Sequence, residues 1–445
     1  MKKFIQTIQN IFKIEELRSR LAITFLLVVI YRFGSFVALP GIDTTQLANL
    51  SEQTEGGLMM LLDMFSGGAF SNASIFALGI MPYITASIVV QLLGMAIPYF
   101  RKLQQDGESG RNKLNQITRY LTVVVLIVQG AAYLANLRMQ LGSVVPEGAF
   151  FLFSSIVILA AGSMFVLWLG ERITERGIGN GVSFIILVGI IARLPQALIG
   201  EFASRLSDAA GGLVMFLAEL VLLLLVICGS ILLVQGTRRI PVQYAKQVIG
   251  NRQYGGVYQF IPLKVNAAGV MPIIFAQAIM FIPASVAGLF TADGEVSNFA
   301  LAMMDVNGFW YNLVFFLLII AFTYFYTAVT INPTQMAEHL KLNNGFIPGV
   351  KPGKKTAEYL DTVMSRITLP GSIFLGVVAI MPAFAGLLGI SQSFAQFFGG
   401  TSLLIMVGVV LDTLQQIESH LLMRHYDGLM ESGKIKGRHG SLAAY

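Results

Sequence analysis

The sequence predicts an all-α membrane protein with ten membrane-spanning helices, arranged as two inverted halves of five. Of the 445 residues, 55% are hydrophobic and only 12% are charged, whereas soluble domains carry about 25% charged residues. The chain contains ten apolar runs long enough to cross about 30 Å of hydrocarbon. In addition, two short segments of the first half return in the same order in the second half.

The ten apolar runs are separated by connections that contain turn-forming or charged residues. They cover residues 21–39, 76–97, 119–138, 150–169, 182–199, 213–234, 266–290, 309–331, 369–389 and 401–420. Cys228 is the single cysteine and lies in the sixth run, so no disulfide can form within the chain. We interpret it as a small buried apolar residue.

The repeated segments indicate a doubled unit. Residues 77–84 (ALGIMPYI) return as 267–274 (AAGVMPII), and residues 181–191 return more faintly as 400–410. Because five spans separate the copies, the repeated helices cross the membrane in opposite directions. Inverted repeats are related by a pseudo-two-fold axis in the membrane plane, and their working site usually lies where the copies meet. We expect helices two, five, seven and ten to meet near that axis.

The basic residues predict the orientation. All but four of the 30 Lys and Arg residues lie on one side if both termini and the even-numbered loops share that side; the exceptions are Arg32, Arg138, Arg193 and Arg205. The positive-inside rule then places both termini in the cytoplasm. The predicted parts are an amphipathic cytoplasmic helix at 1–20, an N-terminal half at 21–211, a C-terminal half at 212–420 and a cytoplasmic tail at 421–445.

One outer segment, residues 57–70, is apolar but too short to span a bilayer. It contains Asp63 and the break Gly67-Gly68, and Ser71 or Asn72 is a candidate cap for the next helix. A broken helix at the mouth of a bundle is tolerated only where protein or an aqueous cavity surrounds it. Two interpretations remain, a re-entrant packing element or a movable stopper.

The sequence lacks the residue patterns of common catalytic and metal sites. None of its four histidines lies deep in a span or shows metal-ligand spacing, and no phosphate-binding glycine loop or nucleophile elbow is present. We therefore expect no enzymatic activity, no metal and no cofactor. Ion-coupled transporters keep charged groups at mid-depth, whereas Glu219 and Asp412 lie near the ends of their runs. Arg32 either snorkels outward or faces the bundle interior as a hydrogen-bond donor.

Branched apolar side chains occupy the repeated segments instead. Six isoleucines lie there, two pairs one helical turn apart in the first copies and one residue in each second copy. They are Ile80, Ile84, Ile186, Ile190, Ile274 and Ile405. Ordinary helix packing is one explanation. The other is a hydrophobic ring on the axis, which excludes water and ions by dewetting and can deform around a bulky chain; this favours a pore for something large and varied.

Two connections on the predicted cytoplasmic side are longer than a turn requires. Residues 235–264 carry five Lys or Arg and no acidic residue, and Val248-Ile249 together with 257–261 suggests a hairpin. Residues 332–368 have a turn-rich tip at 348–353. Because ordered loops usually carry function, we expect a docking surface here, with RNA phosphates as one candidate partner.

Several longer stretches resemble the SecY family of bacterial protein-translocation channels, and the similarity runs from about residue 15 to residue 426. The matching stretches are MFSGGA at 64–69, SIFALGIMPYI at 74–84, GESGR at 107–111, WLGERITERGIGNG at 168–181, PLKVN at 262–266 and GGTSLLI at 399–405. So many matches in order, over nearly the whole chain, make the resemblance specific.

The resemblance implies a clamshell of two five-helix halves around an hourglass pore, in a trimer with SecE and SecG. It implies that the six isoleucines form the pore ring and that 58–72 is the plug, with plug residues Leu62, Asp63, Met64, Phe65, Ser66, Gly67 and Gly68. It also implies a lateral gate between helices two and three on one side and seven and eight on the other. The implied gate-lining residues are Thr85, Gln129 and Asn266.

The two long loops resemble those that bind the ribosome and the motor SecA. The residues implied there are Arg238, Arg239, Lys246, Arg252 and Lys351. At the tip, Lys351 stands where the family has arginine, so the charge is kept but the planar bidentate fork is lost. Gln247 replaces a residue that is usually basic in the family.

The function implied by the resemblance is that of a protein-conducting channel of the general secretory pathway, in the cytoplasmic membrane. Unfolded polypeptides would cross it and transmembrane segments would leave it sideways, driven by a partner motor or the ribosome. Signal peptides, nascent chains and membrane lipids are the further partners implied. The alternatives are an inverted-repeat secondary transporter and a lipid scramblase that uses the lateral opening.

Overall fold

The computed structural model describes residues 14–42, 58–141, 148–207, 212–244, 247–249, 252–254, 258–277, 279–280 and 306–431. Several predicted features lie wholly or partly outside this set, among them most of the N-terminal helix at 1–20, the end of the run 266–290, the end of the tail at 421–445, and Lys246. The side chains of Leu62 and Arg252 lie outside the description too.

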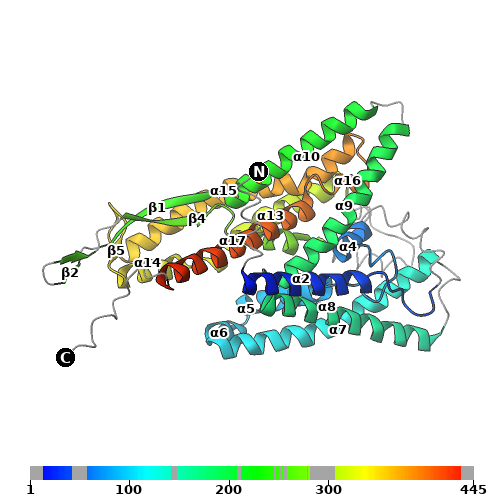
Figure 1. Ribbon diagram of the computed structural model, residues 1–445, viewed down its shortest axis with the longest axis horizontal. Coiled ribbons are helices and arrows are strands. Elements are labelled where there is room, and N and C mark those ends of the chain that lie inside the picture. The colour runs from blue at the N-terminus through cyan, green and yellow to red at the C-terminus, as the bar shows by residue number, and fades with distance from the viewer. Residues whose placement is uncertain are drawn as a thin grey trace. The chain divides into compact units, whose positions relative to one another are not determined.

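The described chain is helical apart from two small sheets (Figure 1). Its helices are α2 (Glu15–Gly34), α4 (Leu58–Ser66), α5 (Met81–Ala96), α6 (Pro98–Gln105), α7 (Gly107–Leu141), α8 (Ala149–Arg176), α9 (Gly181–Ser207), α10 (Gly212–Gln235), α13 (Phe309–Thr330), α14 (Pro333–Leu342), α15 (Lys354–Leu387), α16 (Gln392–Ala395) and α17 (Gly400–Glu431). Its strands are β1 (Thr237–Tyr244), β2 (Gln247–Ile249), β3 (Arg252–Tyr254), β4 (Tyr258–Lys264) and β5 (Gly345–Phe346).

Seven helices among the described residues are long and apolar enough to cross a membrane: α7, α8, α9, α10, α13, α15 and α17. An eighth span results if α5 and α6, which bend by 104° at a short break before Pro98, are counted together. Helix α2 coincides with the first predicted run, although charged residues occupy its first turns. The remaining predicted run, 266–290, is described only as far as Met280.

The repeated sequence segments have repeated local structure. In one copy Gly79 has a φ of +53°, and α5 begins two residues later at Met81. In the other copy Gly269 has a φ of +64°, and a helix begins two residues later at Met271. Glycine is the residue that adopts this left-handed conformation readily. Helices α9 and α17 likewise both begin at the repeated glycine of the second motif, so each copy starts its helix at the same motif position.

The chain divides into two compact units. Unit 1 comprises Met1–Thr54, Met60–Arg193 and Val409–Tyr445, and unit 2 comprises Glu55–Met59 and Leu194–Gly408. The division cuts α9 and α17, whereas the two halves predicted from the sequence meet in the connection after α9. The two compact units are defined by packing, whereas the two predicted halves are defined by the sequence repeat. The division into units therefore does not test the predicted halves, which stay a prediction.

In unit 1, α2 and α8 hold the turn that precedes α5. A Cβ on Gly34 of α2 would overlap the ring of Phe76, and a Cβ on Gly162 of α8 would overlap the carbonyl oxygen of Ile75. The ring of Phe76 also stacks on Tyr31, with 6.3 Å between centroids. These close contacts require glycine in both helices and fix the first copy of the repeated turn.

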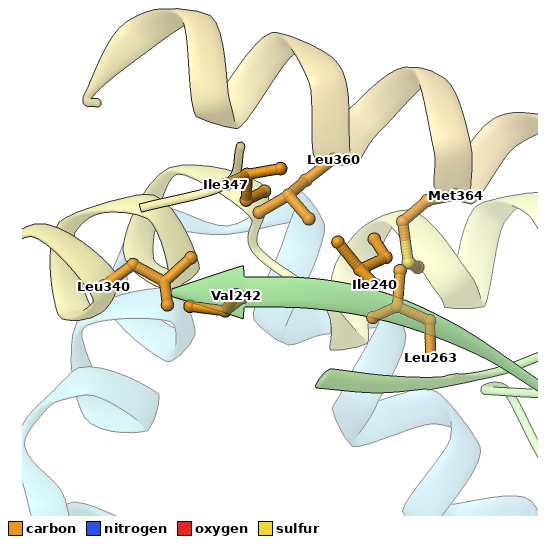
Figure 2. Packing of buried hydrophobic residues seen from close by; sticks show 7 residues of the cluster. All are labelled: Ile240, Val242, Leu263, Leu340, Ile347, Leu360 and Met364. Atoms are coloured by element: carbon orange, nitrogen blue, oxygen red, sulfur yellow. The ribbon is translucent and has the colours of Figure 1, made fainter. Parts of the chain in front are cut away.

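In unit 2, the two long loops predicted to dock partners fold together. β1 pairs antiparallel with β4 and with β5, so the sheet order β4-β1-β5 joins residues 235–264 to residues 332–368. Apolar side chains from β1, β4, α14, α15 and the segment after β5 form a buried cluster (Figure 2). Its members are Ile240, Val242, Leu263, Leu340, Ile347, Leu360 and Met364.

The hairpin predicted within residues 235–264 exists, but its strands have different partners. Val248-Ile249 belong to β2, which pairs with β3, whereas β4 pairs with β1. The register of β1 buries Ile240 and Val242 against the helices of the cluster. The burial of these two side chains determines which strands pair. The helices that bury them belong to a connection about a hundred residues later in the chain.

Candidate functional site

The first candidate site is the end of α4 and the turn that follows it. The helix stops where Gly67 and Gly68 adopt φ values of +66° and +90°. The Gly68 amide donates to the carbonyl oxygen of Asp63 at 2.9 Å, which is the usual glycine stop of a helix. The segment from here to residue 80 consists of turns and one isolated bridge.

The capping role predicted for Ser71 or Asn72 is wrong. The next helix begins only at Met81. The Ser71 amide donates instead to Asp63 Oδ1 at 2.8 Å, and Ser71 Oγ donates to the Gly68 carbonyl oxygen at 3.2 Å. Ser71 therefore closes the turn back onto α4, with the carboxylate of Asp63 as the acceptor for its amide.

Two side chains of α2 bind the carbonyl oxygens at the end of α4. Arg32 Nη1 donates to the Gly67 carbonyl oxygen at 2.7 Å, and Tyr31 Oη donates to the Ser66 carbonyl oxygen at 3.0 Å. The last carbonyls of a helix lack partners within the helix, so α2 supplies them. Of the two interpretations of Arg32, the one that turns it toward the protein interior is correct.

Two further contacts hold the turn from other helices of unit 1. Tyr133 Oη of α7 donates to the Phe70 carbonyl oxygen at 2.9 Å. The turn also touches the backbone of α9: a Cβ on Gly67 would lie 2.8 Å from Gly189 Cα, and a Cβ on Gly189 would lie 2.7 Å from the Phe65 carbonyl oxygen. Neither glycine can carry a side chain without backbone displacement.

Asp63 is ion-paired with Arg193 of α9. Arg193 Nη2 contacts Asp63 Oδ2 and also donates to Ser71 Oγ at 2.6 Å. The Asp63 and Arg193 side chains are 11% and 24% exposed, so the pair is screened less by water than a surface pair. The sequence reasoning missed this pairing, although an arginine that interrupts an apolar run and a lone carboxylate in a short apolar segment were both visible.

None of the six predicted ring isoleucines lies on the exposed surface. Ile80, Ile186, Ile190 and Ile405 are buried, and Ile84 and Ile274 are half-buried. Four belong to unit 1 and two to unit 2. Burial is what both helix packing and a closed hydrophobic ring require, so the ring stays a prediction.

The predicted gate residues are polar side chains away from the exposed surface. Thr85 and Gln129 are half-buried, and Thr85 Oγ1 donates to the Met81 carbonyl oxygen of its own helix at 3.1 Å. Asn266 is buried, and its Oδ1 has no hydrogen-bond partner among the described residues. A buried amide oxygen without a donor is costly, so Asn266 offers an acceptor site. Its role at a gate stays a prediction.

The second candidate site consists of exposed residues on the unit 2 sheet and in the loop after β5. Arg238 and Arg239 of β1 are exposed, as is Lys351 in the loop that follows β5. Tyr258 and Phe260 of β4 are 60% and 58% exposed. Arginines and aromatic rings dominate the binding energy of many protein interfaces, so this sheet combines charge with apolar contact area.

A buried charge cluster lies elsewhere in unit 2. Arg205 Nε donates to Glu201 Oε1 at 2.9 Å, and Arg205 Nη2 forms an ion pair at 2.7 Å with Glu219 Oε1, without hydrogen-bond geometry. Asp412, by contrast, is exposed. The pairing of Arg205 was not evident from the sequence because Glu201 lies beyond the predicted run 182–199.

Cys228 is exposed, not buried as expected from its apolar surroundings. It lies on α10, where Leu224, Leu225 and Leu232 are exposed as well. Lipid tails are as apolar as leucine, so a spanning helix carries apolar residues on its outer face, and apolarity alone does not predict burial there.

Comparison with known proteins decides the family. The SecY family profile matches residues 74–414. The chain is 43% identical over 435 residues to the protein translocase subunit SecY of Streptomyces scabiei, an alignment that covers 94% of this chain and 98% of the relative. This chain belongs to the SecY family.

Solved structures give the fold of the SecY family member described here. A protein conducting channel superposes with a TM-score of 0.62 at 18% identity and covers 90% of this chain and 92% of that one. The same values hold for a SecY protein whose plug domain stabilises the closed state of its translocation channel. The fold class predicted from the sequence, a ten-helix clamshell, is therefore confirmed.

Membership of the SecY family also decides between the predicted functions. The full-length relatives are protein translocase subunits. The prediction of a protein-conducting channel of the general secretory pathway is confirmed, and the secondary transporter is set aside. The chain is a multi-span membrane protein of the translocase family.

Proposed function

We propose that the chain passes unfolded polypeptides out of the cytoplasm through a pore lined by its repeated segments and releases transmembrane segments sideways into the lipid. The main support for this proposal is that the helices of the two repeat copies begin at equivalent positions. All four repeated segments begin a helix at the same motif position, and all six isoleucines of these segments are buried or half-buried. A ring of such side chains seals an idle pore by dewetting and yields to a polypeptide.

In this proposal residues 58–72 are the plug. Its support is the set of contacts that seat the end of α4 against α2, α7 and α9. Most of these contacts are hydrogen bonds to main-chain carbonyls, which water can replace when the segment moves aside. The segment is thus held by several modest interactions rather than by a continuous apolar core.

The lateral gate in this proposal is lined by Thr85, Gln129 and Asn266. The support from Asn266 is its buried Oδ1, which has no donor among the described residues. A polar position of this kind weakens the closed gate relative to an apolar one. A signal peptide that inserts there replaces the contacts of the closed gate.

The exposed residues of the unit 2 sheet and of the neighbouring loops form the proposed docking surface for the ribosome and for SecA. The basic residues proposed for it are Arg238, Arg239, Lys246, Arg252 and Lys351. Exposed arginines suit RNA phosphates, and the exposed rings of Tyr258 and Phe260 suit a protein partner. Lys351 keeps the positive charge of the family's arginine but cannot bind a carboxylate with two parallel hydrogen bonds.

We further propose that the chain performs no catalysis itself and that both termini lie in the cytoplasm. SecE and SecG complete the complex, and SecA or the ribosome supplies the energy for movement. The support for the orientation is the one-sided distribution of Lys and Arg.

The decisive experiment is crosslinking from the proposed ring to a stalled nascent chain. A photoreactive amino acid replaces Ile84 or Ile274 in the full chain. In the control variant it replaces Val124, which is 57% exposed on α7. We expect the ring positions to crosslink to the nascent chain and Val124 to crosslink to lipid. Crosslinks from Val124 alone would overturn the proposed pore.

A second experiment tests the docking surface. We expect Arg239→Glu to weaken ribosome binding to membranes that contain the complex, because it reverses a charge on the sheet. Arg176→Glu is the matched control, since it reverses an exposed arginine at the end of α8, outside both long loops. Equal binding by the two variants would contradict the proposed docking surface.

A further inference from the structure

We propose that the ion pair of Asp63 and Arg193, together with Ser71, is a specificity-determining latch that keeps the plug seated until a strongly apolar signal segment binds. The inference rests on the proposed function of residues 58–72 as the plug. All three latch residues lie within unit 1, so the latch is complete within one compact part of the molecule.

The latch joins two elements that are far apart in sequence. Asp63 lies in α4 and Ser71 in the turn after it, whereas Arg193 belongs to α9, 130 residues after Asp63. Arg193 Nη2 contacts Asp63 Oδ2 and donates to Ser71 Oγ at 2.6 Å. The Ser71 amide donates to Asp63 Oδ1 at 2.8 Å. The three residues therefore form a closed set of contacts, and one guanidinium holds both sides of the glycine turn.

The carboxylate of Asp63 offsets part of the positive charge at the turn. Arg32 and Arg193 approach consecutive residues of the turn. A Cβ on Gly67 would lie 2.7 Å from Arg32 Nη1, and a Cβ on Gly68 would lie 3.1 Å from Arg193 Nη2. Asp63 Oδ2 forms an ion pair with Arg193. If Asp63 loses its charge, Arg193 loses the attraction of this carboxylate in a site partly shielded from water, which disfavours the seated plug.

This contact differs in kind from the others that seat the plug. The carbonyl oxygens of Ser66 and Gly67 can accept hydrogen bonds from water once the plug moves. The ion pair has to be separated, and part of its attraction is lost at that moment. The entering signal segment supplies the free energy, and a segment with more apolar surface supplies more. The latch thus sets the apolar content that a signal needs, and its removal favours weak signals most.

The test uses the full chain, assembled with its partner subunits in export-competent membranes. Asp63→Asn removes one charge and keeps an acceptor for the Ser71 amide, and Arg193→Gln removes the other charge. The matched control is Glu175→Gln, which removes an exposed ion pair with Arg172 at the end of α8. The readouts are the ion conductance of the idle channel and the export of a precursor with a shortened apolar signal, relative to the same precursor with its full signal.

We expect Asp63→Asn and Arg193→Gln each to raise both readouts roughly tenfold, which corresponds to about 1.4 kcal/mol. The double variant has no larger effect than the stronger single variant, because both changes remove the same ion pair. Glu175→Gln changes neither readout. Ser71→Ala, which removes only the hydroxyl, raises both readouts by a smaller factor and replaces the charge variants if they do not accumulate in the membrane.

A variant that lacks residues 58–72 distinguishes a failure of the proposed latch from a failure of the proposed plug. If the deletion raises the conductance while the charge variants match Glu175→Gln, the latch is wrong and the plug stands. If the deletion changes neither readout, the proposed plug is wrong. A double variant whose effect is the product of the single effects would also overturn the latch, since the two residues would then act independently.

Discussion

Two ionic clusters in this molecule share their chemistry but differ in what they connect. In unit 1, Arg193 of α9 pairs with Asp63 at the end of a short helix. In unit 2, Arg205, near the end of α9, pairs with Glu201 one turn away and with Glu219 of α10. Each cluster has one arginine at its centre, so the comparison isolates the effect of the surrounding elements.

The unit 2 cluster is the more deeply buried of the two. The side chains of Glu201, Arg205 and Glu219 are 1%, 10% and 3% exposed. Arg205 Nη2 also donates to the Gly389 carbonyl oxygen at 2.7 Å, and Glu201 Oε2 accepts from the Ser391 amide at 2.9 Å. The cluster therefore ties α9 and α10 to the connection between α15 and α16.

This difference indicates that the effect of an ion pair, on stability or on gating, depends on how easily the elements that it joins can move. The unit 2 cluster lies between long helices, so its contacts can open only if part of the unit unfolds. Asp63 lies in a helix of nine residues that ends at two glycines, so its contact can open by movement of a short segment. We expect charge removal to affect stability in unit 2 and gating in unit 1.

The largest effect is expected for Arg205→Met. The change leaves two buried carboxylates without their cation, and breaking a buried pair in this way costs about 3–5 kcal/mol. Thermal unfolding of the purified protein in detergent measures the loss. Arg172→Met is the control, because Arg172 pairs with Glu175 on the exposed surface, where a pair contributes about 0–1 kcal/mol. Equal losses in the two variants would remove the distinction between the clusters.

An intermediate effect is expected for Gly67→Ala. The new Cβ would lie 2.8 Å from Gly189 Cα, and the left-handed backbone costs about 1–2 kcal/mol with a side chain. We expect a higher idle conductance, because the turn has to move away from α9. Gly107→Ala is the matched control: Gly107 has a φ of +71° but nothing within 4 Å of the new Cβ. If both variants change the conductance alike, contact with α9 does not seat the turn.

The smallest effect is expected for Tyr133→Phe. The variant loses the hydrogen bond to the Phe70 carbonyl oxygen, and a single hydrogen bond of this kind contributes about 1 kcal/mol. We expect the idle conductance to rise by roughly fivefold or less, below the effect of removing a latch charge. Tyr120→Phe, at a position of α7 that is 73% exposed, serves as the control. A larger rise than in Asp63→Asn would show that main-chain contacts, rather than the ion pair, dominate closure.

Sequence reasoning anticipated the candidate site only in part. The short apolar segment, its Asp63 and its glycine break were visible, because length, apolarity and Gly-Gly are local properties. Arg193 stands out in the sequence only as a basic residue outside the predicted cytoplasmic side, and the predicted capping role of Ser71 is wrong. The two errors have different causes: Arg193 meets a residue 130 positions away, whereas Ser71 closes a turn onto Asp63, eight residues earlier.

The sequence by itself determined the membrane class, the apolar runs, the doubled motifs and the glycine stops. Each depends on composition or on residues within a few positions of one another, and these impose spans and turns directly. Only the tertiary structure decided which carboxylate each arginine meets, which strand β1 pairs with, and that Cys228 lies on an exposed face of α10. These outcomes depend on packing between distant segments, and the distance between two charges or two strands exists only after the helices have packed.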